Sequence, residues 1–371
     1  MSENKLSMRN IIIVGGAGLA FSIGSGFATG QEVLQYYAAY GLMGILAMVL
    51  FVALNIYANW QFIEAGHVMQ LSKGNEVYKY FCGKYLGTAF DWFACLFCFM
   101  SFVVMIAGAG ATLNQQYGIP EIPGAIAIAV LTGITVMFGL NRMLDVIGRI
   151  GPVVVVMAIV VAILGIAKGG TDISAALDML KLGEIETLKA GSNWLTSAYS
   201  YLGFGMLWFA GFFAAIGKNQ QNVMDAKFGA VLHSVMLGLA ILVIMFALWA
   251  NMVLVVENEA QVPLLMILDN VSGTAASIFA IIIFIGIYST ACPLLWTPCN
   301  SLAKEGTMQY RILTAVLTVA GCFIGLALPF DILMNYIYTI NGYIGGFMLV
   351  FIIIKHIRVV YAKKKGQASA E

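Results

Sequence analysis

Two glycine pairs and one acidic residue are the features of this sequence that could bind a small ligand. Residues 24–26 read Gly-Ser-Gly, residues 203–205 read Gly-Phe-Gly, and Glu32 lies shortly after the first pair. A glycine weakens a helix interior by about 1 kcal/mol relative to alanine. A helix that unwinds at such a place offers free carbonyls to a cation and free N–H groups to an anion.

The composition places these residues in a membrane protein. Hydrophobic residues make up 61% of the chain, charged residues only 10%, and the mean hydropathy is +0.91, whereas soluble domains carry about 25% charged residues. These values exclude a soluble enzyme, a nucleic-acid binder and a disordered chain. The sequence contains no P-loop pattern of the form GxxxxGK[ST], so we expect no ATP-driven motor. It also offers no metal-ligand cluster and no nucleophile–His–acid arrangement with a plausible site, so we expect no enzyme.

The charge-free stretches predict the transmembrane helices. A helix needs roughly 20 residues to cross a bilayer, and ten stretches come close to or exceed that length. They are residues 10–31, 33–63, 92–120, 122–141, 150–167, 190–217, 228–256, 270–303, 312–330 and 332–354.

Lysine and arginine predict the orientation of these spans. With the N-terminus in the cytoplasm, all but three of the 19 Lys and Arg residues fall on the inner side, and the exceptions are Lys168, Lys181 and Lys189. This bias predicts a multi-pass membrane protein with both termini cytoplasmic. Residues 171–189 and 259–270 are amphipathic and are expected outside, as surface helices or as a lid.

Ten spans divide into two halves of five, which would have opposite orientations in the membrane. The predicted divisions are residues 1–168 (first repeat), 169–189 (extracellular connector), 190–357 (second repeat) and 358–371 (cytoplasmic tail). Each glycine pair falls in the first span of its half, so we expect both of these helices to be interrupted. The alternative is close helix packing through small residues.

The nine residues at 24–32, Gly-Ser-Gly-Phe-Ala-Thr-Gly-Gln-Glu, carry a resemblance to a known group. The chain resembles LeuT-fold transporters of the amino acid–polyamine–organocation superfamily, and more narrowly the YkvI-like bacterial membrane proteins. The resemblance implies an all-α polytopic protein with a 5+5 inverted repeat, in which the first and sixth helices are discontinuous. It also implies a location in the bacterial inner membrane.

The same resemblance implies a Na⁺ site between the first and eighth spans. Ser289 and Thr290 match its hydroxyl ligands, Ala20 and Ile23 its carbonyl donors, and Gly286 could supply a further carbonyl. Such an oxygen-only set suits Na⁺. The alternative is that the two hydroxyl groups bond back to their own helix. We expect no organic cofactor.

The resemblance also implies contacts for a solute at the two interruptions and in the middle of the third span. Small polar groups, aromatic rings and open backbone suit a small amphipathic solute. The matching residues are Ser22, Ser25, Gly26, Met100, Ser101, Val104, Tyr201, Gly203, Phe204 and Phe209.

Glu32 is the ionisable residue that stands out within the spans. Such residues are functional candidates because an isolated charge in lipid is costly. It could carry a proton, contact a cationic amine, or cap a neighbouring helix.

These observations predict a secondary active transporter that moves a small amino acid or related amine by alternating access. Na⁺ is the expected coupling ion, and the expected partners are the solute and the lipid bilayer, without nucleic acid. The alternatives are a proton-coupled transporter of the same fold and a sensor or receptor subunit that binds a solute without transporting it.

Overall fold

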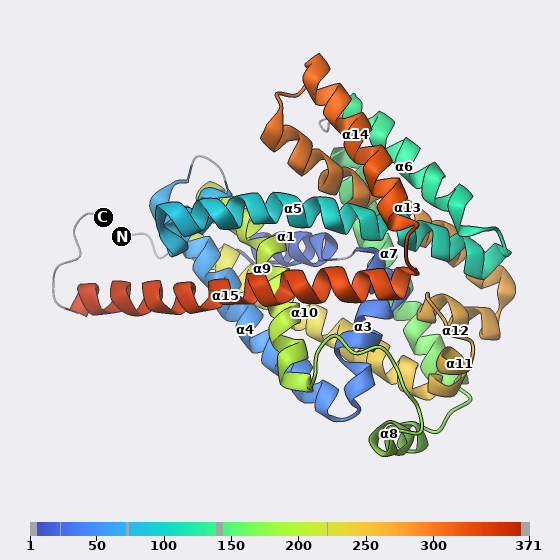
Figure 1. Ribbon diagram of the computed structural model, residues 1–371. Coiled ribbons are helices and arrows are strands. Elements are labelled where there is room, and N and C mark those ends of the chain that lie inside the picture. Colours follow the sequence, from blue (N-terminus) through green and yellow to red (C-terminus); the bar gives the residue numbers. More distant parts are fainter. Residues whose placement is uncertain (1–5, 23, 72–73, 139–143, 221, 365–371) are drawn as a thin grey trace.

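The computed structural model describes residues 6–22, 24–71, 74–138, 144–220 and 222–364, which form helices joined by short connections (Figure 1). The helices of the first half are α1 (Met8–Phe21), α2 (Ser25–Thr29), α3 (Gln31–Tyr36), the 3₁₀ helix η1 (Ala38–Tyr40), α4 (Met43–Met69), α5 (Glu76–Tyr117), α6 (Glu121–Met137) and α7 (Leu144–Lys168). Those that follow are α8 (Ile173–Leu182), α9 (Trp194–Asn219), α10 (Val223–Ala250), α11 (Met252–Glu257), α12 (Pro263–Val271), α13 (Gly273–Leu302), α14 (Met308–Gly325) and α15 (Phe330–Lys364).

Seven helices of the described chain are long and apolar enough to cross a membrane: α4, α5, α9, α10, α13, α14 and α15. An eighth crossing arises if α7 and α8 are counted as one span bent by 95°. Helices α1 and α6 are apolar but shorter. The protein is therefore a multi-pass membrane protein, while the count of ten spans and the orientation stay predictions.

The long helices form two packed groups. Helix α1 packs on α10, α10 on α4, and α4 on α9, which makes one group. Helices α5, α6, α13 and α14 form the second group, and α6, α13 and α14 gather at one corner of the molecule (Figure 1). Helix α15 contacts both α9 and α5, so it joins the two groups.

The first span is divided into short helices. Helix α1 ends at Phe21, Gly24 has extended backbone (φ −97°, ψ −171°), and α2 begins at Ser25. A second change of direction follows at Gly30, whose φ of +83° is in the left-handed region. This conformation favours glycine because a Cβ would clash there. The chain thus leaves the helical path where the sequence predicts an interruption.

The interruption predicted in the sixth span is wrong, because α9 runs as one helix through Gly203 and Gly205. Gly203 instead allows α9 to approach α15 closely. A Cβ at Gly203 would lie 1.9 Å from the carbonyl oxygen of Gly342 and 2.2 Å from the nitrogen of Gly346. The second glycine pair therefore follows the packing alternative.

The predicted amphipathic segments contain helices α8 and α12, which are shorter than the segments 171–189 and 259–270. Asp172 caps α8, and its side chain accepts hydrogen bonds from the hydroxyl and amide of Ser174. These hydrogen bonds lower the pKa of Asp172 below its ordinary value, because they favour the charged form. At the other end of the chain, residues 358–364 continue α15, so the tail predicted from residue 358 begins as helix.

The packing role of Gly203 can be tested with its neighbour in the pair. We expect Gly203→Ala to lower the free energy of unfolding by about 1–3 kcal/mol, because the added methyl group would overlap the backbone of α15. Gly205→Ala is the matched control, since a Cβ there would meet only the Phe209 ring, at 3.5 Å. Thermal unfolding in detergent measures both variants. Equal destabilisation by the two substitutions would contradict the packing role.

Candidate functional site

The Glu32 carboxylate lies in the interior, beside the first glycine pair. Its side chain is 2% exposed, and Oε2 accepts a hydrogen bond from the Tyr201 hydroxyl at 3.1 Å. The backbone amide of Phe27 is a further hydrogen-bond partner. The side chain covers Gly26, where a Cβ would lie 2.3 Å from Oε1. Gly26 therefore leaves the space that the carboxylate fills.

Glu32 has no cationic partner within 4.0 Å in the described part of the chain, where the ion pair found is Glu64 with Lys227. An ionised carboxylate that is cut off from water and unpaired costs much free energy. In this closed arrangement, a proton or a cation at Glu32 would remove that cost.

Three aromatic rings pack around the ring of Tyr201. The Tyr201 ring centroid lies 4.9 Å from that of Tyr36, 5.3 Å from that of Tyr37 and 4.8 Å from that of Phe51. Tyr36 follows Glu32 by four residues, which places both on one face of α3. That spacing was a signal from which Tyr36 could have been predicted, whereas Phe51 comes to the site from α4 through packing alone.

Helices α5 and α15 contribute further side chains that pack around Phe204 of α9. Tyr338 of α15 stacks on Phe204 with ring centroids 4.7 Å apart, and Phe97 of α5 lies edge-on to Phe204 at 5.6 Å. Asn341 lies next to Met100, with 3.8 Å between Nδ2 and Sδ. These contacts bring the third and tenth predicted spans to the site, and Phe97, Tyr338 and Asn341 were not among the predicted contacts.

Several buried side-chain oxygens in the described interior have no hydrogen-bond partner. More than about 90% of buried polar groups in proteins are bonded, so these exceptions mark a place where a polar ligand could bind. They include Gln31 Oε1, Tyr37 Oη, Ser101 Oγ and Asn341 Oδ1. Ser25 and Ser101 are predicted solute contacts, and both are fully buried.

A second aromatic group encloses the end of α1. The Trp208 indole N–H donates to the Phe21 carbonyl at 3.2 Å, and the Phe21 ring stacks on Phe212 with centroids 4.6 Å apart. Phe209 lies 5.9 Å from Phe21 and 5.3 Å from the His233 ring. The predicted contact Phe209 thus belongs to this group, beside α1 and α10.

The other predicted solute contacts are spread around the interruption. Ser22 donates to the Gly18 carbonyl at 2.9 Å, and Val104 is fully buried on α5. Gly203 contacts the backbone of α15. The structure therefore brings Gly26 and Tyr201 against Glu32, with Ser25 next to Gly26 in the chain and the Phe204 ring 5.6 Å from that of Tyr201. It places Gly203 at a helix–helix contact.

The predicted Na⁺ ligands on α13 lie next to the interruption. A Cβ at Gly24 would be 4.0 Å from the Thr290 methyl group. Ser289 Oγ and Thr290 Oγ1 donate to the Gly286 carbonyl at 2.7 and 3.1 Å, as the alternative interpretation expects. Ala20 lies in the last turn of α1, and Ile23 is outside the described residues.

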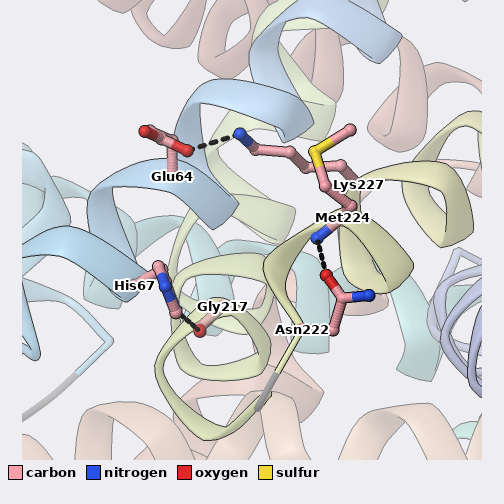
Figure 2. Close-up of polar contacts among 6 residues, drawn as sticks. All are labelled: Glu64, His67, Gly217, Asn222, Met224 and Lys227. Atoms are coloured by element: carbon pink, nitrogen blue, oxygen red, sulfur yellow. Dashed lines mark hydrogen bonds and ion pairs between the residues drawn. The ribbon is translucent and has the colours of Figure 1, made fainter. Parts of the chain in front are cut away.

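Helices α4, α9 and α10 are connected by polar contacts at the ends nearest their connecting loops, and Figure 2 shows them. Glu64 of α4 forms an ion pair with Lys227 of α10, whose ammonium also lies 4.9 Å from the Trp60 ring centroid. His67 contacts the Gly217 carbonyl of α9 at 3.3 Å. The Asn222 side chain caps α10 by accepting from the Met224 amide at 3.1 Å.

Comparisons with known proteins identify the fold. The chain matches a Na⁺-coupled sialic acid symporter in a substrate-bound outward-open state, with a TM-score of 0.59 and 15% identity over 93% of this chain and 78% of the symporter. It matches inward-facing Mhp1 with a TM-score of 0.55 and 15% identity over 92% of this chain and 75% of Mhp1. The chain has the LeuT-type transporter fold.

Sequence comparison reaches one relative without an assigned function. The uncharacterized protein YyaD of Bacillus subtilis (strain 168) is 23% identical over 335 residues, which cover 90% of this chain and 93% of YyaD. No family model matches the sequence. The YkvI-like assignment therefore stays a prediction, while the LeuT-type fold rests on the two structures.

The ion pair between Glu64 and Lys227 can be tested with a double-mutant cycle. We expect Glu64→Gln to lower the free energy of unfolding by about 1–3 kcal/mol, because it leaves the buried Lys227 ammonium without its carboxylate. The double variant Glu64→Gln/Lys227→Met should lose less than the sum of the two single variants. Additive losses in thermal or chemical unfolding would show that the pair contributes no coupling.

Proposed function

We propose that this protein is a secondary active transporter that carries a small amino acid or related amine by alternating access, coupled to Na⁺. The observation that carries the proposal is the interrupted first span with a buried carboxylate beside it that has no ion-pair partner among the described residues. Interrupted helices whose free main chain lines a central site are typical of secondary transporters. The LeuT-type fold, shared with a Na⁺-coupled symporter, supports the same conclusion.

Alternating access would require the two helix groups to move relative to each other. Tyr201 lies on α9 of the first group, whereas Ser101 and Thr290 lie on α5 and α13 of the second group. Gly26 lies on α2, which contacts both α5 and α13. The solute and the ion would bind where the groups meet, so binding there would favour one relative position of the groups over another.

The oxygen atoms near Thr290 fit a Na⁺ ion. A hydroxyl that donates its hydrogen keeps lone pairs on oxygen, so Ser289 and Thr290 could coordinate a cation. The Gly286 carbonyl already accepts from both hydroxyl groups, so we expect these hydrogens to turn away when the carbonyl and hydroxyl oxygens bind Na⁺. The main-chain carbonyls of Ala20 and Ile23 would complete the set.

Proton coupling is the second candidate, and the burial of Glu32 without a cation favours it. A carboxylate in such surroundings can be neutralised by a proton. The titratable groups that face it are tyrosines, namely Tyr36, Tyr37, Tyr201 and Tyr338. Tyrosine hydroxyl groups stay protonated near neutral pH, so the exchangeable proton would be that of Glu32.

Uptake into proteoliposomes separates the candidate functions. Accumulation of a labelled solute that requires a Na⁺ gradient would support Na⁺ symport. Accumulation that follows a pH gradient without Na⁺ would support proton coupling. Binding without uptake under either gradient would contradict transport and favour a receptor subunit.

A single hydroxyl group tests the Na⁺ site. We expect Thr290→Ala to raise the Na⁺ concentration for half-maximal uptake by about tenfold, because one oxygen ligand is lost. Thr297→Ala is the matched control, since Thr297 also lies on α13 and bonds back to the Pro293 carbonyl at 2.8 Å. Unchanged Na⁺ activation in Thr290→Ala, measured beside the control, would remove Thr290 from the site.

A further inference from the structure

We infer that the solute is an organic ammonium ion without a carboxylate of its own, bound by Glu32 within the rings of Tyr36, Tyr37 and Tyr201. This inference rests on the proposed transport function and chooses between its two solute classes, amines and amino acids. Three independent features of the site support it: its charge, its free hydrogen-bonding groups and its aromatic walls.

The charge of the site favours a cation. Glu32 already places a carboxylate beside the interruption, where it receives the Tyr201 hydroxyl and the Phe27 amide. The carboxylate of an amino acid would compete for these donors and would meet a like charge. No cation in the described part of the chain lies within 4.0 Å of Glu32 to offset that repulsion. An ammonium group instead supplies the missing counter-charge.

The unused hydrogen-bonding groups favour a donor. Gln31 Oε1, in the residue before Glu32, is a buried amide oxygen without a partner in the described structure, and such an oxygen can only accept a hydrogen bond. The buried Tyr37 hydroxyl, also without a partner there, can accept one as well. The unbonded buried side-chain nitrogens of the described residues are those of His233, which packs against Phe209 and Phe213. An ammonium group carries donors and no acceptor, so it complements the oxygens around Glu32.

The aromatic walls also favour a cation. The ring centroids of Tyr36, Tyr37 and Phe51 lie 4.9, 5.3 and 4.8 Å from that of Tyr201. Faces of aromatic rings attract organic cations, and the attraction is strongest where water is excluded. The Tyr201 hydroxyl now donates to Glu32, so an entering ammonium would replace it as the donor.

Matched pairs of ligands test the inference on the full-length wild-type protein. Each amine is compared with the amino acid that differs from it by one carboxylate: phenethylamine with phenylalanine, and isobutylamine with valine. Phenylethanol serves as a neutral control. A ligand that binds the folded state raises the unfolding temperature. We expect a rise with at least one amine at millimolar concentration, and none with its paired amino acid or with the alcohol.

Two results with the wild-type protein would overturn the inference. One is an amino acid that stabilises the protein as much as its paired amine, or more. The other is an unfolding temperature that neither phenethylamine nor isobutylamine changes. Both results are measured on the wild-type protein, so the inference can be tested even if the variants do not fold.

Variants then locate the binding site. Glu32→Gln should weaken amine binding by at least about tenfold, because the charged partner of the ammonium is removed. Glu257→Gln, which removes an exposed carboxylate on α11, should bind the amine like wild type. Tyr201→Phe keeps the ring and removes the competing hydroxyl, so amine affinity should be equal or higher. Unchanged amine binding by Glu32→Gln would contradict the assigned site.

The outcome can be separated from that of the transport proposal. Gradient-driven uptake of amino acids together with no response to amines would leave the transporter and reject the ammonium site. Amine binding that requires Glu32, without uptake in proteoliposomes, would keep the ammonium site and reject transport.

Discussion

The interior of the first span imposes one requirement on the rest of the structure: each main-chain group freed by the interruption needs a partner, because lipid offers none. The Phe21 carbonyl is bound by the Trp208 indole, and the Phe27 amide is a partner of Glu32. Both arrangements depend on α9, which supplies Trp208 and the Tyr201 hydroxyl that holds the Glu32 carboxylate. The interruption and α9 therefore form one unit, and the candidate site lies between them.

The two glycine pairs show how context decides the effect of the same residues. Gly24 has extended backbone between two helices. Gly203 stays helical, because the absence of a side chain lets α9 touch the glycines of α15. The free energy gained in this close packing offsets the weak helical preference of glycine. In the first half of the proposed repeat, the glycine pair interrupts a helix. In the second half, the glycine pair allows two helices to pack closely.

Two glutamates in the first half of the chain have opposite electrostatic surroundings. Glu64 is partly exposed and paired with Lys227, so it fastens α4 to α10. Glu32 is buried among tyrosines and lacks a cation among the described residues. A carboxylate of the second kind costs free energy unless a proton or a cation joins it. That difference is the physical reason why Glu32, and not Glu64, is suited to bind an exchangeable ligand.

The sequence by itself determined the membrane class, the approximate positions of the seven long apolar helices and the place where the first span is interrupted, because these depend on local composition and on glycine. It also singled out Glu32, since an acidic residue within apolar helices is conspicuous. The tertiary structure decided which glycine pair packs, and it brought Phe51, Tyr338 and Asn341 from distant helices to the interior. Helical periodicity shows which residues share a face, but it does not show which helix covers that face. The partners of Glu32 therefore followed only from how α3, α9 and α15 pack together.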